Sequence, residues 1–336
     1  MVRAPKLVRG IIRSTPPCST TRAYAPAALR VSECAVRPAG GGPTGAALWH
    51  NVPADHSVEL RFRVNPRPPW APDEIDVERP SAARMYDFFL GGSNNFAADR
   101  RLAQEYLQVL PDLPAIARAQ RAVLHRAVRF LAEAGVDQFL DLGSGMPTVG
   151  NVHEIAQRAN PEARVVYVDV DPVAAAHGRA LLGRTPHTGV VLADLRDCAY
   201  VLGHPVSKEL LDLSRPVAVL MIAVLHFLAD RDEPAAVVRR YRDATAPGSY
   251  VAVTHATDEY DPVMAKRAEE VYRKASHHMH YRSKLEITAL LDGYDLVEPG
   301  LVDMIRWRPE PDPGPDPLGG DVTRYSGYAA VGRKTT

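Results

Sequence analysis

The segment at residues 139–145 constrains this chain most, because a short apolar run carrying one acid ends there in two glycines spaced Gly-x-Gly. A helical pattern follows over residues 148–159, so the segment predicts a strand, a tight turn and a helix start. Glycine allows a positive φ and a close approach of the backbone to a ligand, and a helix N-terminus offers unpaired N–H groups. The pattern predicts a site for a nucleotide or nucleoside cofactor, although an ordinary α/β turn that binds nothing would also produce it.

Asp141, the acid in this run, indicates which cofactor binds. A carboxylate beside the turn would repel a phosphate, and the dinucleotide fingerprint G-x-G-x-x-G/A is incomplete because Thr148 occupies its sixth position. A cofactor with a cationic group suits the carboxylate better. S-adenosylmethionine carries an α-ammonium and a sulfonium and no phosphate, so we expect Asp141, Gly143, Ser144 and Gly145 to bind its methionine end.

The second and third apolar runs also end in acids, Asp169 and Asp194. An acid at the end of the second strand can accept hydrogen bonds from both ribose hydroxyls, and a carboxylate after the third can accept one from an adenine amino group. We therefore expect Asp169 to bind the ribose, and Asp194 with Leu195 to bind the adenine. Asp171, which precedes Pro172 and a helix, is better interpreted as a helix N-cap.

The fourth apolar run, residues 215–226, predicts a buried strand. We expect its end, Ala223 to His226, to lie beside the methionine end of the cofactor and beside the molecule that accepts a group from it. If the reaction needs a base, His226 is the first candidate, and His255 and a cluster of three histidines come after it. That cluster lacks the i, i+4 spacing of a helical metal pair, so no metal site is predicted; it comprises His277, His278 and His280. The Asn/Asp-Pro-Pro-aromatic sequence of amino-group methyltransferases is absent after this run, which speaks against a DNA-base amine as acceptor.

An unusual segment, residues 86–96, precedes all of these strands. It follows a predicted helix at residues 81–90 and combines aromatic and polar side chains with Gly91 and Gly92. One interpretation is a lid over the cofactor in which Tyr86, Gly91 and Asn95 contribute contacts. The alternative is a packed helix that ends at the two glycines.

Four stretches carry a resemblance to a known family: residues 80–100, 139–152, 166–172, and 298–302 with 306–309. Their order resembles a class I S-adenosylmethionine-dependent methyltransferase and, more closely, a bacterial family known simply as S-adenosyl methyltransferases. The resemblance covers roughly residues 75–335. Met146 and Pro147 depart from the general pattern, in which a further glycine is common, and fit the closer family.

The resemblance implies a Rossmann-like, doubly wound α/β sheet of seven strands, mostly parallel with one antiparallel strand near an edge, and an N-terminal helical cap. It also implies S-adenosylmethionine as cofactor and methyl transfer as the reaction, but it does not identify the acceptor, which we expect to be a small molecule. Two alternatives remain open. One is an NAD(P)-dependent oxidoreductase on the same topology, which Asp141 and Thr148 disfavour; the other is a non-catalytic protein that binds S-adenosylmethionine.

Periodicity and breakers divide the chain into three parts. Residues 1–72 are rich in breakers and lack a hydrophobic period, so we expect a disordered or non-native extension, with a targeting signal as the weaker alternative. Residues 73–135 predict a helical cap or lid, and residues 136–336 predict the cofactor-binding domain. Beyond the strands above, we expect helices at 99–109, 113–134, 262–276 and 283–291, strands at 249–254, 296–307 and 325–331, and a surface loop at 309–320.

Composition excludes several classes of function. The 40 basic and 40 acidic residues give a formal net charge of zero, so no global attraction to nucleic acid or to a membrane is expected. No apolar run reaches the ~20 residues that a membrane span needs. The three cysteines, Cys18, Cys34 and Cys198, follow no metal-ligand spacing, and so sparse a set suits a reducing compartment such as the cytoplasm.

Overall fold

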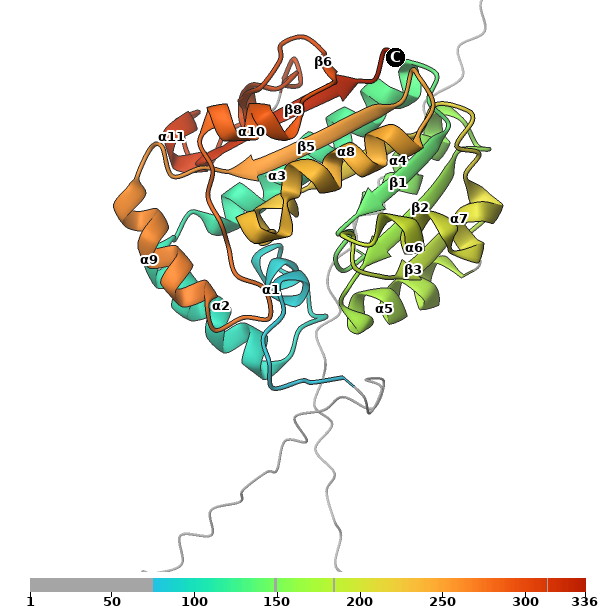
Figure 1. Ribbon diagram of the computed structural model, residues 1–336. Helices are drawn as coiled ribbons and strands as arrows, with labels where there is room; N and C mark the ends of the chain where they lie inside the picture. Colours follow the sequence, from blue (N-terminus) through green and yellow to red (C-terminus); the bar gives the residue numbers. More distant parts are fainter. Residues whose placement is uncertain (1–74, 148–149, 184, 313) are drawn as a thin grey trace, which may run out of the picture. The chain divides into compact units, whose positions relative to one another are not determined.

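The computed structural model describes residues 75–336 except 148–149, 184 and 313 (Figure 1). The extension expected at residues 1–72 lies outside these residues. In the described part, every helix is too short or too polar to cross a bilayer.

The described residues build one mixed sheet with the strand order β3-β2-β1-β4-β5-β8-β6, in which β7 also pairs with β8. The strands β1 to β5 are parallel to one another, and β8 runs antiparallel to β5, β6 and β7. This is the predicted Rossmann-like arrangement, mostly parallel with an antiparallel region at one side. The strands are β1 (Gln138–Leu142), β2 (Arg164–Asp169), β3 (Thr188–Leu192), β4 (Ala218–Ile222), β5 (Tyr250–Ala256), β6 (Asp295–Leu296), β7 (Val302–Asp303) and β8 (Gly327–Arg333).

Helices cover both faces of the sheet, which explains why the central strands are mostly apolar. Successive side chains of a strand point to opposite faces, so Phe139 packs under α3 (Leu113–Glu133), α4 (Val152–Ala159) and α5 (Pro172–Leu182), whereas Leu140 packs on the other face. The helices of that second face are α6 (Cys198–Gly203), α7 (Pro205–Leu210), α8 (Pro234–Ala244) and α10 (Lys284–Leu290).

A third apolar cluster joins helices from distant parts of the chain. It contains side chains of three helices, α1 (Ala82–Phe89), α2 (Ala97–Val109) and α9 (Pro262–Tyr272). We call these three helices the cap. Figure 1 shows these three helices together beside the ends of the parallel strands. The arrangement differs from the division expected from sequence, because α3 lies mainly against the sheet and α9, from the second half of the chain, completes the cap.

Several predicted elements have different bounds or are broken. The expected fourth strand stops at Ile222, because Ala223 has a φ of 55°, and the chain continues in the 3-10 helix η1 (Leu225–Phe227). The expected bent strand at 296–307 is divided into β6, β7 and the 3-10 helix η3 (Met304–Arg306). The last expected strand begins later, after α11 (Val322–Tyr325). Another 3-10 helix, η2 (Asp230–Asp232), precedes α8.

Candidate functional site

A cavity of about 390 Å³ lies where the parallel strands end and the cap begins, which is a typical size and place for a ligand site in an open α/β sheet. Ten of the residues predicted from sequence line it: Tyr86, Asp141, Gly143, Ser144, Gly145, Asp169, Asp194, Leu195, Ala223 and His226. Gly91 and Asn95 are not among the residues that line this cavity.

The glycine turn after β1 is shaped by backbone conformation and by a close approach. Gly143 and Gly145 have φ values of 72° and 66°, in the region that favours glycine. A Cβ atom on Gly143 would lie 2.3 Å from Cγ2 of Val224, so this position has no room for a side chain. Above Gly145, by contrast, no atom lies within 4 Å of an added Cβ, and this open space belongs to the cavity.

Asp169, at the end of β2, is fixed by two backbone donors. The N–H of Gly145 donates to its Oδ2 at 2.7 Å, and the N–H of Asp171 donates to its Oδ1 at 2.8 Å. Burial raises the pKa of Asp169 to about 6, although both of these hydrogen bonds lower it. The two backbone donors therefore fix the orientation of the carboxylate. Asp169 also lines the cavity, and a carboxylate has further lone pairs that can accept from hydroxyl donors there.

Asp141 is buried on the neighbouring strand, and its charge is poorly compensated. Burial raises its pKa to about 7; Arg121 opposes this effect and Asp169 adds to it. Arg121 comes from α3, lines the same cavity and donates to the carbonyl of Gly150 at 2.9 Å. Nothing in the sequence distinguished Arg121 from the other arginines of its helix, because only the packing of α3 on β1 brings it to the turn.

Asp194, after β3, lies in the cavity wall in a bidentate ion pair. Its two carboxylate oxygens accept hydrogen bonds of 2.6 to 3.0 Å from Arg196, which also bonds Asp232 at 2.7 Å. Burial would raise the pKa of Asp194, but the contacts with Arg196 hold it below its usual value. The carboxylate of Asp194 therefore stays ionised. The contacts of Asp194 and Leu195 with adenine remain a prediction.

His226 follows β4 in a loop that lines the cavity. Its side chain is only 3% exposed, and its Nδ1 atom has no hydrogen-bond partner among the described residues. Burial, and after it the neighbouring His255, Arg282 and His280, hold the pKa of His226 well below its usual value. The imidazole is therefore neutral at physiological pH.

The loop that carries His226 is held by Arg282, and His255 of β5 bonds Arg282 in turn. His255 accepts a hydrogen bond from Nη1 of Arg282 at 3.1 Å through Nε2, so its Nδ1 carries the proton and donates to the carbonyl of Ala256 at 2.7 Å. Arg282 also donates to the carbonyl of Leu228 at 2.8 Å. Arg282 also contacts the carbonyl of Leu225 at 3.4 Å, so it bonds the backbone on either side of His226. Both ring nitrogens of His255 are occupied, by Arg282 and by the carbonyl of Ala256.

The predicted lid segment has mainly internal contacts. The side-chain amide of Asn95 donates to Asp87 at 2.8 Å and to the carbonyl of Gly92 at 3.0 Å, and Gly91 ends α1 with a φ of 82°. Asn95 and Gly91 thus shape the end of the helix, and the expectation that they contact the cofactor is not supported by their positions. Tyr86 does reach the cavity wall, where its hydroxyl donates to the carbonyl of Ala117 at 3.0 Å.

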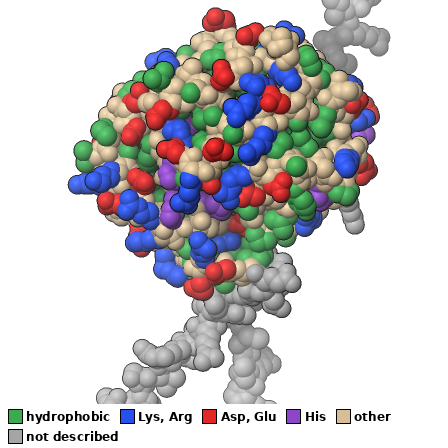
Figure 2. Space-filling view, viewed as in Figure 1, with side chains coloured by type: hydrophobic (Ala, Val, Ile, Leu, Met, Phe, Trp, Pro, Cys, Tyr) green, Lys and Arg blue, Asp and Glu red, His purple; other side chains and the backbone are tan. Residues whose placement is uncertain are grey.

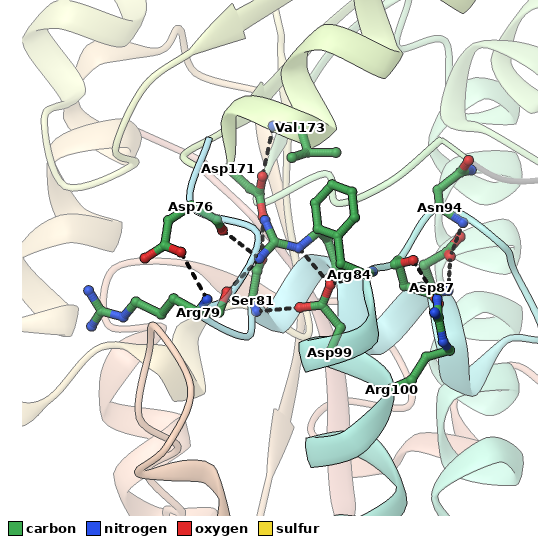
Figure 3. Close-up of polar contacts among 12 residues, drawn as sticks. Asp76, Arg79, Ser81, Arg84, Asp87, Asn94, Asp99, Arg100, Asp171 and Val173 are labelled. Atoms are coloured by element: carbon green, nitrogen blue, oxygen red, sulfur yellow. Dashed lines mark hydrogen bonds and ion pairs between the residues drawn. The ribbon is translucent and has the colours of Figure 1, made fainter. Parts of the chain in front are cut away.

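A buried ionic network joins the cap to the start of α5, next to the end of β2 (Figure 3). Arg84 bonds Asp99 at 2.9 Å and Asp171 at 3.3 Å, and Asp171 also accepts from the hydroxyl of Ser81. Asp171 caps α5 through the N–H of Val173 at 2.8 Å, as its position before Pro172 predicted. Ser81 lies at the N-cap position of α1 as expected, but its side chain bonds Asp171 and does not cap the helix.

Two further observations concern metal ligands and surface charge. Among the described residues, no group of three or more histidine, cysteine or acidic side chains could hold a metal ion. The space-filling view in Figure 2 shows acidic and basic side chains mixed over the visible face, in keeping with the zero formal net charge.

Comparison with known proteins agrees with this geometry. The family model described as S-adenosyl methyltransferase matches residues 68–335 of the 336. A structure from Thermobifida fusca YX, described as a candidate methyltransferase, is 44% identical, covers 80% of this chain and 100% of its own, and has a TM-score of 0.74. A DUF574 family protein from Streptomyces avermitilis MA-4680 is 39% identical over 77% of this chain and 99% of its own, also with a TM-score of 0.74.

Among curated proteins, none matches the chain. The family match nevertheless spans the cap, the glycine turn and every strand of the sheet, and it decides against the nicotinamide-dependent oxidoreductase that the sequence left open. The chain belongs to the S-adenosyl methyltransferase family, whose cofactor is S-adenosylmethionine.

Proposed function

We propose that this protein methylates a small molecule that binds in the cavity between the strand ends and the cap. The observation that carries the proposal is that one cavity contains both the carboxylates suited to a cationic nucleoside and, beside them, a buried histidine with an unsatisfied ring nitrogen. A protein that only sensed the cofactor would have no need of that second group.

The residues present fit the cofactor. Asp169, aligned by two backbone N–H groups, would accept hydrogen bonds from the ribose hydroxyls, and Asp141 would face the positive methionine end beside the open turn at Gly145. Asp194 and Leu195 would hold the adenine. When bound, S-adenosylmethionine supplies an electrophilic methyl group and leaves as a neutral thioether, so an acceptor hydroxyl that gains the methyl must lose one proton.

His226 is the group that we assign to that proton. Its neutral imidazole lines the cavity and can accept a hydrogen bond at one ring nitrogen. Side chains of the cap line one side of the cavity. Because the pKa of His226 is low, it is a weak base, and it serves best with an acceptor whose own proton is acidic.

Isothermal titration with S-adenosylmethionine, S-adenosylhomocysteine and NAD tests the cofactor assignment. We expect heat from the first two ligands and none from NAD. A second experiment measures S-adenosylhomocysteine released on incubation with S-adenosylmethionine and a panel of phenols, amines and carboxylic acids. Turnover that falls at least tenfold in His226→Gln, with unchanged cofactor affinity, supports the proposal. Cofactor binding with no turnover of any acceptor would favour the non-catalytic alternative.

A further inference from the structure

The cap side of the cavity is walled by rings that come from four separate elements. Phe89, Tyr106, Phe227 and Tyr272 all line the cavity, and we call them the aromatic wall. Their ring centroids form a chain: Phe89 to Tyr106 at 6.1 Å, Tyr106 to Tyr272 at 5.1 Å, and Tyr272 to Phe227 at 5.7 Å. Phe227 in turn lies 4.5 Å from the ring of His226, so the wall runs from the cap to the proposed base.

The wall offers no charge to a ligand. Among the described cavity-lining residues of α1, α2 and α9, the one charged side chain is Arg84, and its guanidinium is already paired with Asp99 and Asp171. Asp141, Asp169 and Asp194 line the cavity at the strand ends. Since an unpaired ion is costly to bury in apolar surroundings, a charged molecule would bind poorly against this wall.

Two polar atoms of this region lack strong partners inside the protein. Nδ1 of His226 is buried without a hydrogen bond among the described residues. The hydroxyl of Tyr106 makes only long contacts, at 3.3 Å to the hydroxyl of Tyr281 and 3.5 Å to the sulfur of Met279. Buried polar groups are nearly always satisfied in native proteins. A ligand hydroxyl in the cavity could bond the imidazole of His226, which lines it, in either tautomer, because a hydroxyl both donates and accepts.

We infer that the aromatic wall is the acceptor site, and that the acceptor is an uncharged, planar aromatic molecule whose hydroxyl bonds the imidazole of His226. This inference rests on the proposed function and adds the substrate class to it. Rings favour a planar aromatic partner over an aliphatic one because they pack on its faces and edges. A phenolic proton is also acidic enough for a weak base such as His226 to assist its removal.

The experiment titrates three probes into the protein saturated with S-adenosylhomocysteine. The probes are 2-naphthol, 2-naphthoate, which has the same rings and a negative charge, and decahydro-2-naphthol, which keeps the hydroxyl but has no aromatic ring. We expect 2-naphthol to bind at least tenfold more tightly than either of the others at pH 7.5. Equal affinity for 2-naphthol and decahydro-2-naphthol, or tighter binding of 2-naphthoate, would overturn the inference.

Variants then locate the site. Phe227→Leu and Tyr272→Leu remove rings of the wall and should weaken 2-naphthol binding at least fivefold, with S-adenosylhomocysteine affinity changed less than twofold. His226→Gln should weaken 2-naphthol more than it weakens naphthalene, which has no hydroxyl. Tyr200→Leu is the matched control, because Tyr200 is 52% exposed on α6 and lies outside the cavity lining; it should change nothing.

Phe227 is only partly buried, so Phe227→Leu keeps the test usable if Tyr272→Leu fails to fold. Competition between 2-naphthol and S-adenosylhomocysteine would place the probe in the cofactor site and refute the inference. Failure of the wild-type protein to bind S-adenosylhomocysteine would instead refute the proposed function. Normal cofactor binding without 2-naphthol binding would refute the inference alone.

Discussion

Replacing Asp141 with asparagine should stabilise the cofactor-free protein while weakening its cofactor binding. Asp141 is buried with little compensation, and its pKa rises from 3.8 to about 7. The folded state therefore binds a proton more tightly than the unfolded state does, and folding stability falls as pH rises from about 4 to about 7. At about 1.4 kcal/mol per pKa unit, the ionised side chain costs up to roughly 4 kcal/mol above pH 8.

The expected signature is a pH-dependent gain. Asp141→Asn should raise the free energy of unfolding by about 2–4 kcal/mol at pH 8.5 and by less than about 0.5 kcal/mol at pH 4. Urea unfolding of both proteins without ligand, at half-unit steps between those pH values, measures it. Asp169 titrates in both proteins and so largely cancels in the difference. Asp292→Asn, at an exposed position outside the cavity lining, is the control and should show no such gain.

Cofactor affinity should move in the opposite direction. If Asp141 faces the cationic methionine end, removing its charge should cost about 1.5–3 kcal/mol, which is roughly a 10- to 150-fold loss. In the wild type, S-adenosylmethionine should also bind more tightly as pH rises through about 7, because the bound cation favours the ionised carboxylate. A stability gain of equal size at pH 4 and pH 8.5, or unchanged affinity in Asp141→Asn, would refute the reasoning.

Three further outcomes test other parts of the site. Asp169→Ala should weaken S-adenosylmethionine binding by about 1.5–3 kcal/mol in calorimetry, and full affinity in a folded variant would remove Asp169 from the site. Gly143→Ala should lower both the thermal midpoint and the affinity, because its Cβ would lie 2.3 Å from Val224 at a φ of 72°; partial rescue by Val224→Ala is expected, and no loss at all would contradict the geometry. Hydrogen exchange at residues 86–96 should slow when S-adenosylhomocysteine is added, with no change at residues 309–312, and indifference of the first segment would mark it as a fixed cap.

The sheet was predictable because its signals are local. Each parallel strand is an apolar run of five to seven residues in the structure, and each is separated from the next by a helical pattern, so the order of elements follows directly from periodicity. The fourth strand shows the limit of this reasoning. Its apolar run continues to Leu228, but a positive φ at Ala223 turns the chain into η1, and the residue type gave no warning because alanine rarely adopts that conformation.

The cofactor side of the site was also largely predictable. Parallel strands bring their carboxyl ends to one edge, so acids that end successive strands must meet there. Asp141 and Asp169 do so, and the charge of Asp169 helps to raise the pKa of Asp141. Gly91 and Asn95 do not line the cavity, and the sequence could not distinguish their two interpretations, because a Gly-Gly pair beside polar residues has the same signature in a lid and at the end of a packed helix.

By itself, the sequence determined the alternation of strands and helices in the parallel half, the glycine turn and the acids around it, because these depend on neighbours in the chain. Only the tertiary structure decided which side chains from distant parts of the chain contact one another around the site. Arg84 meets Asp171 across 87 residues of chain, and Tyr106 meets Tyr272 although their helices belong to opposite halves of the protein. Such contacts arise from the packing of the cap on the finished sheet, where many apolar helix faces could have paired, and no local pattern specifies which of them did.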